Sequence, residues 1–147
     1  MIGVREDLTT ILEFITRESL NYLKAHRSTN FPMEEKGGIL KTRSIYAPDP
    51  LDGQVGLFEE KEIARKAIKQ ERSFWLQEPK DFEEFFKYER RKRKLTSLLN
   101  TPLYSLDKPI GAFSVVLINE RRSFDEKNLK CLSLFRSQAS MIIENAR

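Results

Sequence analysis

The chain has 147 residues, of which 39% are hydrophobic and 33% charged, with a net charge of +4, a composition typical of one globular domain and not of a disordered chain. The single cysteine, Cys131, excludes an internal disulfide and a Cys/His zinc site, and no apolar run is long enough to span a membrane. We therefore expect one domain, residues 1–147, in the cytoplasm of a bacterial or archaeal cell.

The first half of the chain predicts a helix, a hairpin and a second helix. Apolar residues recur at helical spacing in residues 7–25. The runs STNFPM and ILKTRSIYA flank EEKGG and predict a hairpin, whose first strand is expected at an edge or to be irregular because it contains Pro32. APDPLDGQ is a loop. GLFEEKEIARKAIKQE predicts a helix whose inner face holds Phe58, Ile63, Ala67 and Ile68.

The second half predicts strand, helix, hairpin and helix. SFWLQEP is a short strand, and residues 81–95 predict a helix with Asp81 as its cap. TSLLNTPLYSL and PIGAFSVVLIN form a hairpin across Asp107-Lys108. The final helix, SFDEKNLKCLSLFRSQASMIIENAR, has Ser123 as cap and Glu126 completing a capping box. Paired strands with helices at both ends indicate the α+β class and an antiparallel sheet.

Several short motifs in residues 97–146 follow one family's pattern. A strand ends in Pro-Leu, the next begins with Ile-Gly, a Phe opens the last helix, and that helix carries Gln-Ala; these are Pro102, Leu103, Ile110, Gly111, Phe124, Gln138 and Ala139. With them the chain resembles a GAF domain over nearly its whole length. The resemblance implies a GAF/PAS-like central antiparallel sheet, with the N- and C-terminal helices packed on one face and a ligand pocket on the other.

The resemblance also implies a function. GAF domains belong mostly to signalling proteins, so we expect a small-molecule-sensing regulatory domain of a signal-transduction or transcription-regulating protein. Its ligand state would pass through the C-terminal helix to an output domain of the same polypeptide. A dimerisation module with no ligand is the alternative. The ligand and any cofactor are not identified by the sequence.

The special chemistries of the family find little support in these residues. Cyclic-nucleotide-binding members carry a motif that Asn119-Glu120, Phe124 and Asp125-Glu126 match neither in charge nor in spacing. Pigment-binding members need a Cys before the Pro-Leu strand, and methionine-sulfoxide-reducing members need several. His26, the only histidine, is expected to cap the end of the first helix. We expect no enzymatic activity and no metal site.

The expected pocket wall combines aromatic residues with polar residues in otherwise apolar strands. Asn100, Thr101 and Ser114 would need a partner if buried, which either a ligand or a neighbouring protein group could supply. Because the resemblance places residues 82–95 over the pocket, Arg90 or Arg93 could reach an anionic ligand. The candidate ligand-binding residues are Phe74, Trp75, Phe82, Phe85, Phe86, Tyr88, Arg90, Arg93, Asn100, Thr101 and Ser114.

The basic run at residues 87–94 raises a third possibility, polyanion binding. It holds six basic residues and one acidic, so the rest of the chain has a net charge of −1. On a helix Lys87, Arg91 and Lys94 share the face opposite the Phe residues, as a solvated face would. Polyanion binding would require bases from several elements. We therefore expect neither nucleic-acid nor membrane binding.

The final helix predicts a homodimer through the terminal helices. Its apolar residues at spacing 3, 4, 3, 4 are Leu132, Phe135, Ala139, Ile142 and Ala146, which is the seam of a coiled coil. Cys131, Leu134, Met141 and Ile143 widen this stripe. The first helix has a comparable stripe at Leu8, Leu12 and Ile15. In the alternative interpretation the additional apolar residues pack only against the first helix of the same chain.

Overall fold

The computed structural model describes residues 4–32, 44–84, 94–105 and 107–145. Their elements in chain order are α1 (Val4–Leu23), β1 (Arg27–Pro32), β2 (Ser44–Tyr46), the 3-10 helix η1 (Pro50–Asp52), α2 (Leu57–Gln70), β3 (Phe74–Leu76), the 3-10 helix η2 (Pro79–Glu84), β4 (Leu95–Ser105), β5 (Lys108–Ile118) and α3 (Glu126–Asn145).

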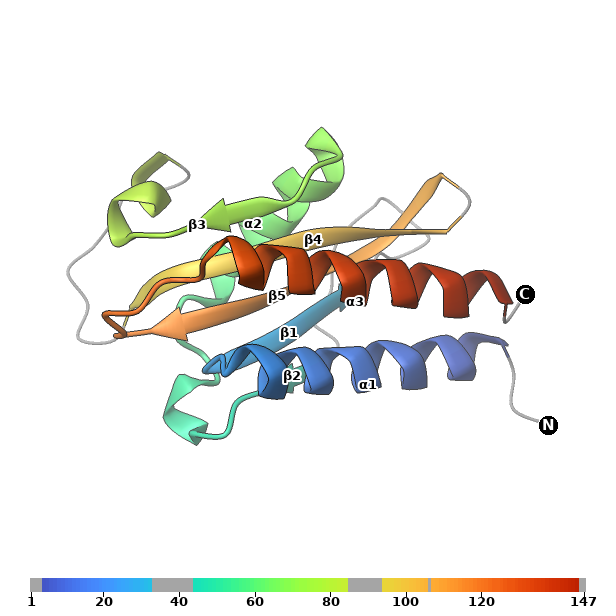
Figure 1. The fold of residues 1–147 in the computed structure, drawn as a ribbon, viewed down its shortest axis with the longest axis horizontal. Helices are drawn as coiled ribbons and strands as arrows, with labels where there is room; N and C mark the ends of the chain where they lie inside the picture. The colour runs from blue at the N-terminus through green and yellow to red at the C-terminus, as the bar shows by residue number, and fades with distance from the viewer. Residues whose placement is uncertain (1–3, 33–43, 85–93, 106, 146–147) are drawn as a thin grey trace.

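The five strands form one antiparallel sheet in the order β2-β1-β5-β4-β3. Helices α1 and α3 lie side by side and antiparallel on one face, and α2 lies behind the other face (Figure 1). Because α1 and α3 run in opposite directions, the start of α1 and the end of α3 lie at the same end of the sheet (Figure 1). This arrangement confirms the predicted α+β class with both terminal helices on one face.

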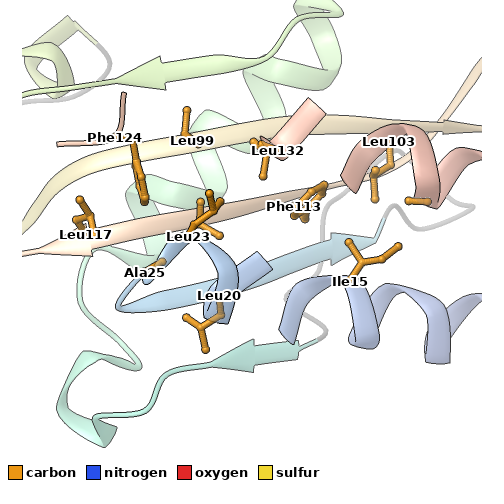
Figure 2. Packing of buried hydrophobic residues seen from close by; sticks show 12 residues of the cluster. Ile15, Leu20, Leu23, Ala25, Leu99, Leu103, Phe113, Leu117, Phe124 and Leu132 are labelled. Atoms are coloured by element: carbon orange, nitrogen blue, oxygen red, sulfur yellow. The ribbon is translucent and has the colours of Figure 1, made fainter. Parts of the chain in front are cut away.

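The larger core lies between the terminal helices and the sheet. Phe113, Val115 and Leu117 alternate along β5 with residues of the other face, and they pack with Ile15 of α1 and Leu132 of α3. Figure 2 shows this cluster between the two helices and the sheet. The indole Nε1 of Trp75 donates a hydrogen bond to the Phe124 carbonyl oxygen at 2.9 Å. The strand β3 is thereby tied to the chain that enters α3.

The position of β1 differs from the prediction. Instead of lying at an edge, β1 pairs with both β2 and β5, and the short strand β2 is at the edge. Pro32 is the last residue of β1. A proline removes a backbone N–H, and at a strand end this loss interrupts no further pairing. The EEKGG corner lies outside the described residues.

Three predictions about helix faces and caps were wrong. Phe58 is 71% exposed, and the buried face of α2 instead carries Glu60 together with Ile63, Ala64 and Ala67. The described start of the predicted helix at residue 81 is the 3-10 helix η2, in which the Asp81 carboxylate accepts hydrogen bonds from the backbone N–H groups of residues 77 and 78. At α3 the cap is Asp125, two residues after the predicted one.

The α3 cap is a reciprocal pair of hydrogen bonds. The Asn128 N–H donates to Asp125 Oδ1 at 2.8 Å, and the Asp125 N–H donates to Asn128 Oδ1 at 2.9 Å. This is a capping box with an amide in place of the predicted Glu126 carboxylate, and it satisfies two N–H groups that the helix itself leaves unpaired. The loop that precedes α3 is therefore two residues longer than predicted.

Candidate functional site

A row of polar residues crosses the sheet on the face that α2 covers. Thr29 of β1 lies opposite Ser114 of β5, and Ser114 lies opposite Asn100 of β4. Residues that face one another across adjacent antiparallel strands point to the same side of the sheet. We call these three residues the polar row; all three are buried. On β3 the row is continued by Phe74, which lies opposite Asn100.

The polar row divides the apolar packing beneath α2 into two clusters. One cluster contains Ile63, Leu98 and Val116, and the other contains Phe31, Ala64 and Ala112. Along β5, Ser114 stands between Ala112 and Val116, and along β4, Asn100 follows Leu98 by two residues. A continuous apolar face would have been the simpler packing solution. The polar row interrupts the apolar face, and a polar function is expected at this interruption.

An ion pair lies beside the row and is wholly buried. The Arg27 guanidinium Nη2 is 2.7 Å from Glu60 Oε2, and both side chains have 0% exposure. Arg27 Nη1 also donates to the Asp52 carbonyl oxygen at 2.9 Å and to that of Val55. Because each ion contacts the opposite charge, and Arg27 also donates to two backbone carbonyls, the pair is compensated inside the protein. It fixes the loop before α2, and α2 itself, to the sheet.

Glu60 also satisfies two members of the polar row. Its Oε2 accepts a hydrogen bond from Thr29 Oγ1 at 3.4 Å, and its Oε1 accepts one from Ser114 Oγ. The carboxylate thus collects donors from β1 and β5 as well as from Arg27. The sequence left open whether a ligand or a protein group would be the hydrogen-bond partner of Ser114. In the structure this partner is Glu60.

Asn100, the third member of the row, has no such partner. Its side chain is 0% exposed, and within the structure described neither Oδ1 nor Nδ2 has a hydrogen-bond partner. Arg27 and Asn30 each have one unpartnered buried atom but bond through others. A buried donor or acceptor without a partner costs about 1–3 kcal/mol. Asn100 therefore carries a standing penalty that a bound polar group would relieve.

The predicted ligand-binding residues fall on both faces of the sheet. Phe74, Phe82, Asn100 and Ser114 come together on the α2 face, where Phe82 packs with Phe74. Trp75 is on the face of the terminal helices, next to Phe124. Thr101 is buried, and its hydroxyl accepts from Ser73 Oγ at 2.9 Å. Phe85, Phe86, Tyr88, Arg90 and Arg93 lie outside the described residues, as does most of the basic run.

Three residues that organise this site were not predicted from the sequence, namely Arg27, Thr29 and Glu60. One signal was available. Glu60 precedes Ile63, Ala64 and Ala67 by three, four and seven residues, so it shares their face of the helix. A charged residue on an otherwise apolar helix face is rarely buried without a charge partner. The basic residue Arg27 in the strand RSTNFP was the natural candidate for it.

The predicted dimer residues divide into buried, exposed and undescribed sets. Ile15, Leu132 and Ala139 are buried within a single copy of the chain, and Phe135 packs edge-on against the ring of Tyr22 at 6.1 Å between centroids. For Leu8, Leu12 and Ile142 only the helical backbone is described, and Ala146 lies outside the described residues. Among the side chains of α1 and α3 that the structure describes, the large apolar ones that are exposed are Phe14, Tyr22, Leu134 and Met141.

His26 and Cys131 lie outside the polar row. His26 Nδ1 accepts a hydrogen bond from the Ile118 N–H at 2.7 Å, and its Nε2 lies 3.5 Å from Glu120 Oε2. In place of the expected helix cap, His26 ties the end of α1 to the end of β5. Burial raises the pKa of the Cys131 thiol, so the nucleophilic thiolate is less populated near neutral pH than in a free thiol.

In the described ranges, no three His, Cys, Asp or Glu side chains gather closely enough to hold a metal ion. No helix in those ranges is both long and apolar enough to cross a bilayer.

Comparison with known proteins points to one family. The sequence pattern of the GAF domain matches residues 5–144. No curated protein matches the sequence. Among solved structures, the PixJ GAF domain of Thermosynechococcus elongatus has a TM-score of 0.70 at 16% identity and covers 99% of this chain and 89% of its own. The second GAF domain of DevS from Mycobacterium smegmatis has a TM-score of 0.71 at 15% identity, covering 95% and 94%.

A third similar structure comes from a chemotaxis protein. Residues 122 to 287 of a methyl-accepting chemotaxis protein have a TM-score of 0.68 at 17% identity, covering 95% of this chain and 90% of that one. At these identities the likeness shows the fold alone. It agrees with the arrangement of five strands and three α-helices described above.

Proposed function

Because the chain belongs to the GAF domain family, we propose that it senses a small molecule on the α2 face of its sheet and relays the ligand state through α3. In this proposal, residues 1–147 form a single, non-catalytic regulatory domain of a bacterial signalling protein. The protein is cytoplasmic, and an output domain lies in the same polypeptide. Similar folds occur in a methyl-accepting chemotaxis protein and in the cyanobacteriochrome receptor PixJ. The family by itself does not identify the ligand.

The observation that carries the proposal is the unpartnered Asn100 amide. A buried polar group needs a hydrogen-bond partner, and Asn100 lies in a row whose other two members have theirs in Glu60. The row lies on the sheet face opposite the terminal helices, where the family resemblance implies a ligand pocket. A ligand that pairs with Asn100 would complete the row.

The same strand offers a route for the relay. β4 presents Asn100 to the α2 face and its neighbour Leu99 to the opposite face, where Leu99 packs in the cluster that holds Leu132 of α3. β3, next to β4, is hydrogen-bonded through Trp75 to the start of α3. A shift of β4 on ligand binding would therefore bias the position of α3.

A thermal-shift screen of bacterial metabolites against the purified domain tests the proposal. A ligand that binds the folded state at ten times its Kd should raise Tm by about 3–5 °C. The shift should disappear in Asn100→Leu and persist in Ser73→Ala, which alters a hydroxyl bonded to Thr101. A screen in which no shift depends on Asn100 would favour the alternative function, a dimerisation module with no ligand.

We also propose that the domain dimerises through α1 and α3. Phe14, Tyr22, Leu134 and Met141 are each more than 60% exposed in one copy, and burying such side chains would drive association. Sedimentation at micromolar concentration should show a dimer, and Leu134→Glu should raise its dissociation constant at least tenfold. Ser133→Glu, at a neighbouring exposed position, is the matched control. A wild-type chain that stays monomeric at 100-fold higher concentration would refute the dimer.

A further inference from the structure

We infer that the ligand is a neutral molecule that presents an N–H donor and a C=O acceptor side by side, as a lactam or a pyrimidine-dione does. The inference rests on the proposed function and concerns the chemistry of the molecule that Asn100 recognises. Two features of the buried face lead to it: the hydrogen-bonding capacity of Asn100 that the protein leaves unused, and the state of the charges around it.

The first feature is that both ends of the Asn100 amide are unpartnered. Oδ1 is an acceptor, Nδ2 is a donor, and the two lie in one plane. A carboxylate or phosphate would satisfy only Nδ2, and an ammonium group only Oδ1. A group that carries a donor and an acceptor on one edge satisfies both atoms together. Because the side chain is fully buried, an edge that pairs with one atom alone would leave part of the desolvation cost in place.

The second feature is that the site's charges are already used. Glu60 Oε2 accepts from Arg27 and Thr29, and its Oε1 accepts from Ser114. Both guanidinium Nη atoms of Arg27 also have partners. An ionic ligand would bring a further charge into a buried region in which Arg27 and Glu60 already compensate each other, and such a charge is costly.

The surroundings of Asn100 are mainly apolar. Phe74 lies opposite it on β3, Leu98 precedes it by two residues on the same face, and Phe82 packs with both in one apolar cluster. Apolar neighbours of this kind favour a weakly polar molecule that hydrogen-bonds through one edge.

Three probes that share a ring test the inference on the intact chain: uracil, 1,3-dimethyluracil and orotate. Uracil has the paired N–H and C=O, the dimethyl compound has lost both N–H groups, and orotate adds a carboxylate. Calorimetric titration should show uracil binding to the wild type, with at least tenfold weaker binding of the other two. Asn100→Leu should abolish uracil binding, and Ser73→Ala should leave it unchanged.

The outcomes separate the inference from the function on which it rests. Equal binding of uracil and 1,3-dimethyluracil would overturn the paired-edge requirement, and tighter binding of orotate would overturn neutrality. Either result, if lost in Asn100→Leu, leaves the sensing function standing with a different ligand class. Binding of none of the three overturns the inference. If the metabolite screen also yields no shift that depends on Asn100, the sensing function fails with it.

Discussion

Replacing Arg27 with Met should lower the free energy of unfolding by about 3–5 kcal/mol, the range found when one member of a buried ion pair is removed. The loss has a definite cause. Glu60 would stay fully buried with its charge uncompensated, and two backbone carbonyls before α2 would lose their donor. Urea unfolding followed by circular dichroism measures the change.

Two further variants serve as controls for this result. Arg65→Met removes an ion pair with Glu62 in which both side chains are partly exposed, and it should change stability by less than about 1 kcal/mol. The double variant Arg27→Met/Glu60→Leu removes both charges and should recover part of the loss, because Thr29 and Ser114 then lose their acceptor. If Arg27→Met cost no more than Arg65→Met, the pair would not be buried as described.

Replacing Gly111 with Ala should destabilise the protein by about 2–4 kcal/mol. A Cβ at this position would lie 2.6 Å from the carbonyl oxygen of Phe31 and 3.0 Å from Cα of Pro32. Both are backbone atoms of the paired strand β1, so the sheet would have to shift, and overpacking of this kind costs about 1–3 kcal/mol. The positive φ of Gly111 adds strain for any other residue.

Gly53→Ala is the matched control for this substitution. Gly53 has φ of −64°, and an added Cβ would meet its nearest atom, the Pro50 carbonyl oxygen, at an ordinary 3.4 Å. Alanine there should be neutral or stabilising by about 0.4–1 kcal/mol, because it restricts the unfolded chain. Equal effects at the two glycines would show that the close approach of β1 to β5 is not what requires glycine at position 111.

The sequence was sufficient to predict an antiparallel sheet and the order of the strands and α-helices along the chain, but not the position of β1 within the sheet. Alternation and helical spacing are local signals, and they located the β4–β5 hairpin and the three α-helices that the structure describes. The strand that contains Pro32 was predicted at an edge or as irregular, whereas β1 lies inside the sheet. The number of partners of a strand depends on the whole sheet, which no local pattern contains. The cap at Asp125 was missed because Ser123 fits the same local rule for a helix cap equally well.

The candidate site was less predictable. Asn100 and Ser114 stood out as polar residues in apolar strands, but their neighbours Arg27, Thr29 and Glu60 come from three separate segments of the chain. Only the cross-strand register brings them together. Trp75 and Phe74 are adjacent in sequence and were grouped as one wall, although alternation along a strand puts them on opposite faces. That error could have been avoided from the sequence alone.

The free energy of unfolding of Asn100→Leu without any ligand tests the central claim most directly. If the Asn100 amide is buried without a partner, a leucine of similar size should remove the penalty and stabilise the domain by about 1–2 kcal/mol. Ser114→Ala, which takes a donor from Glu60, should instead destabilise it by about 1 kcal/mol. A loss of 1 kcal/mol or more in Asn100→Leu would show that the amide is already satisfied, and would contradict a site kept open for a ligand.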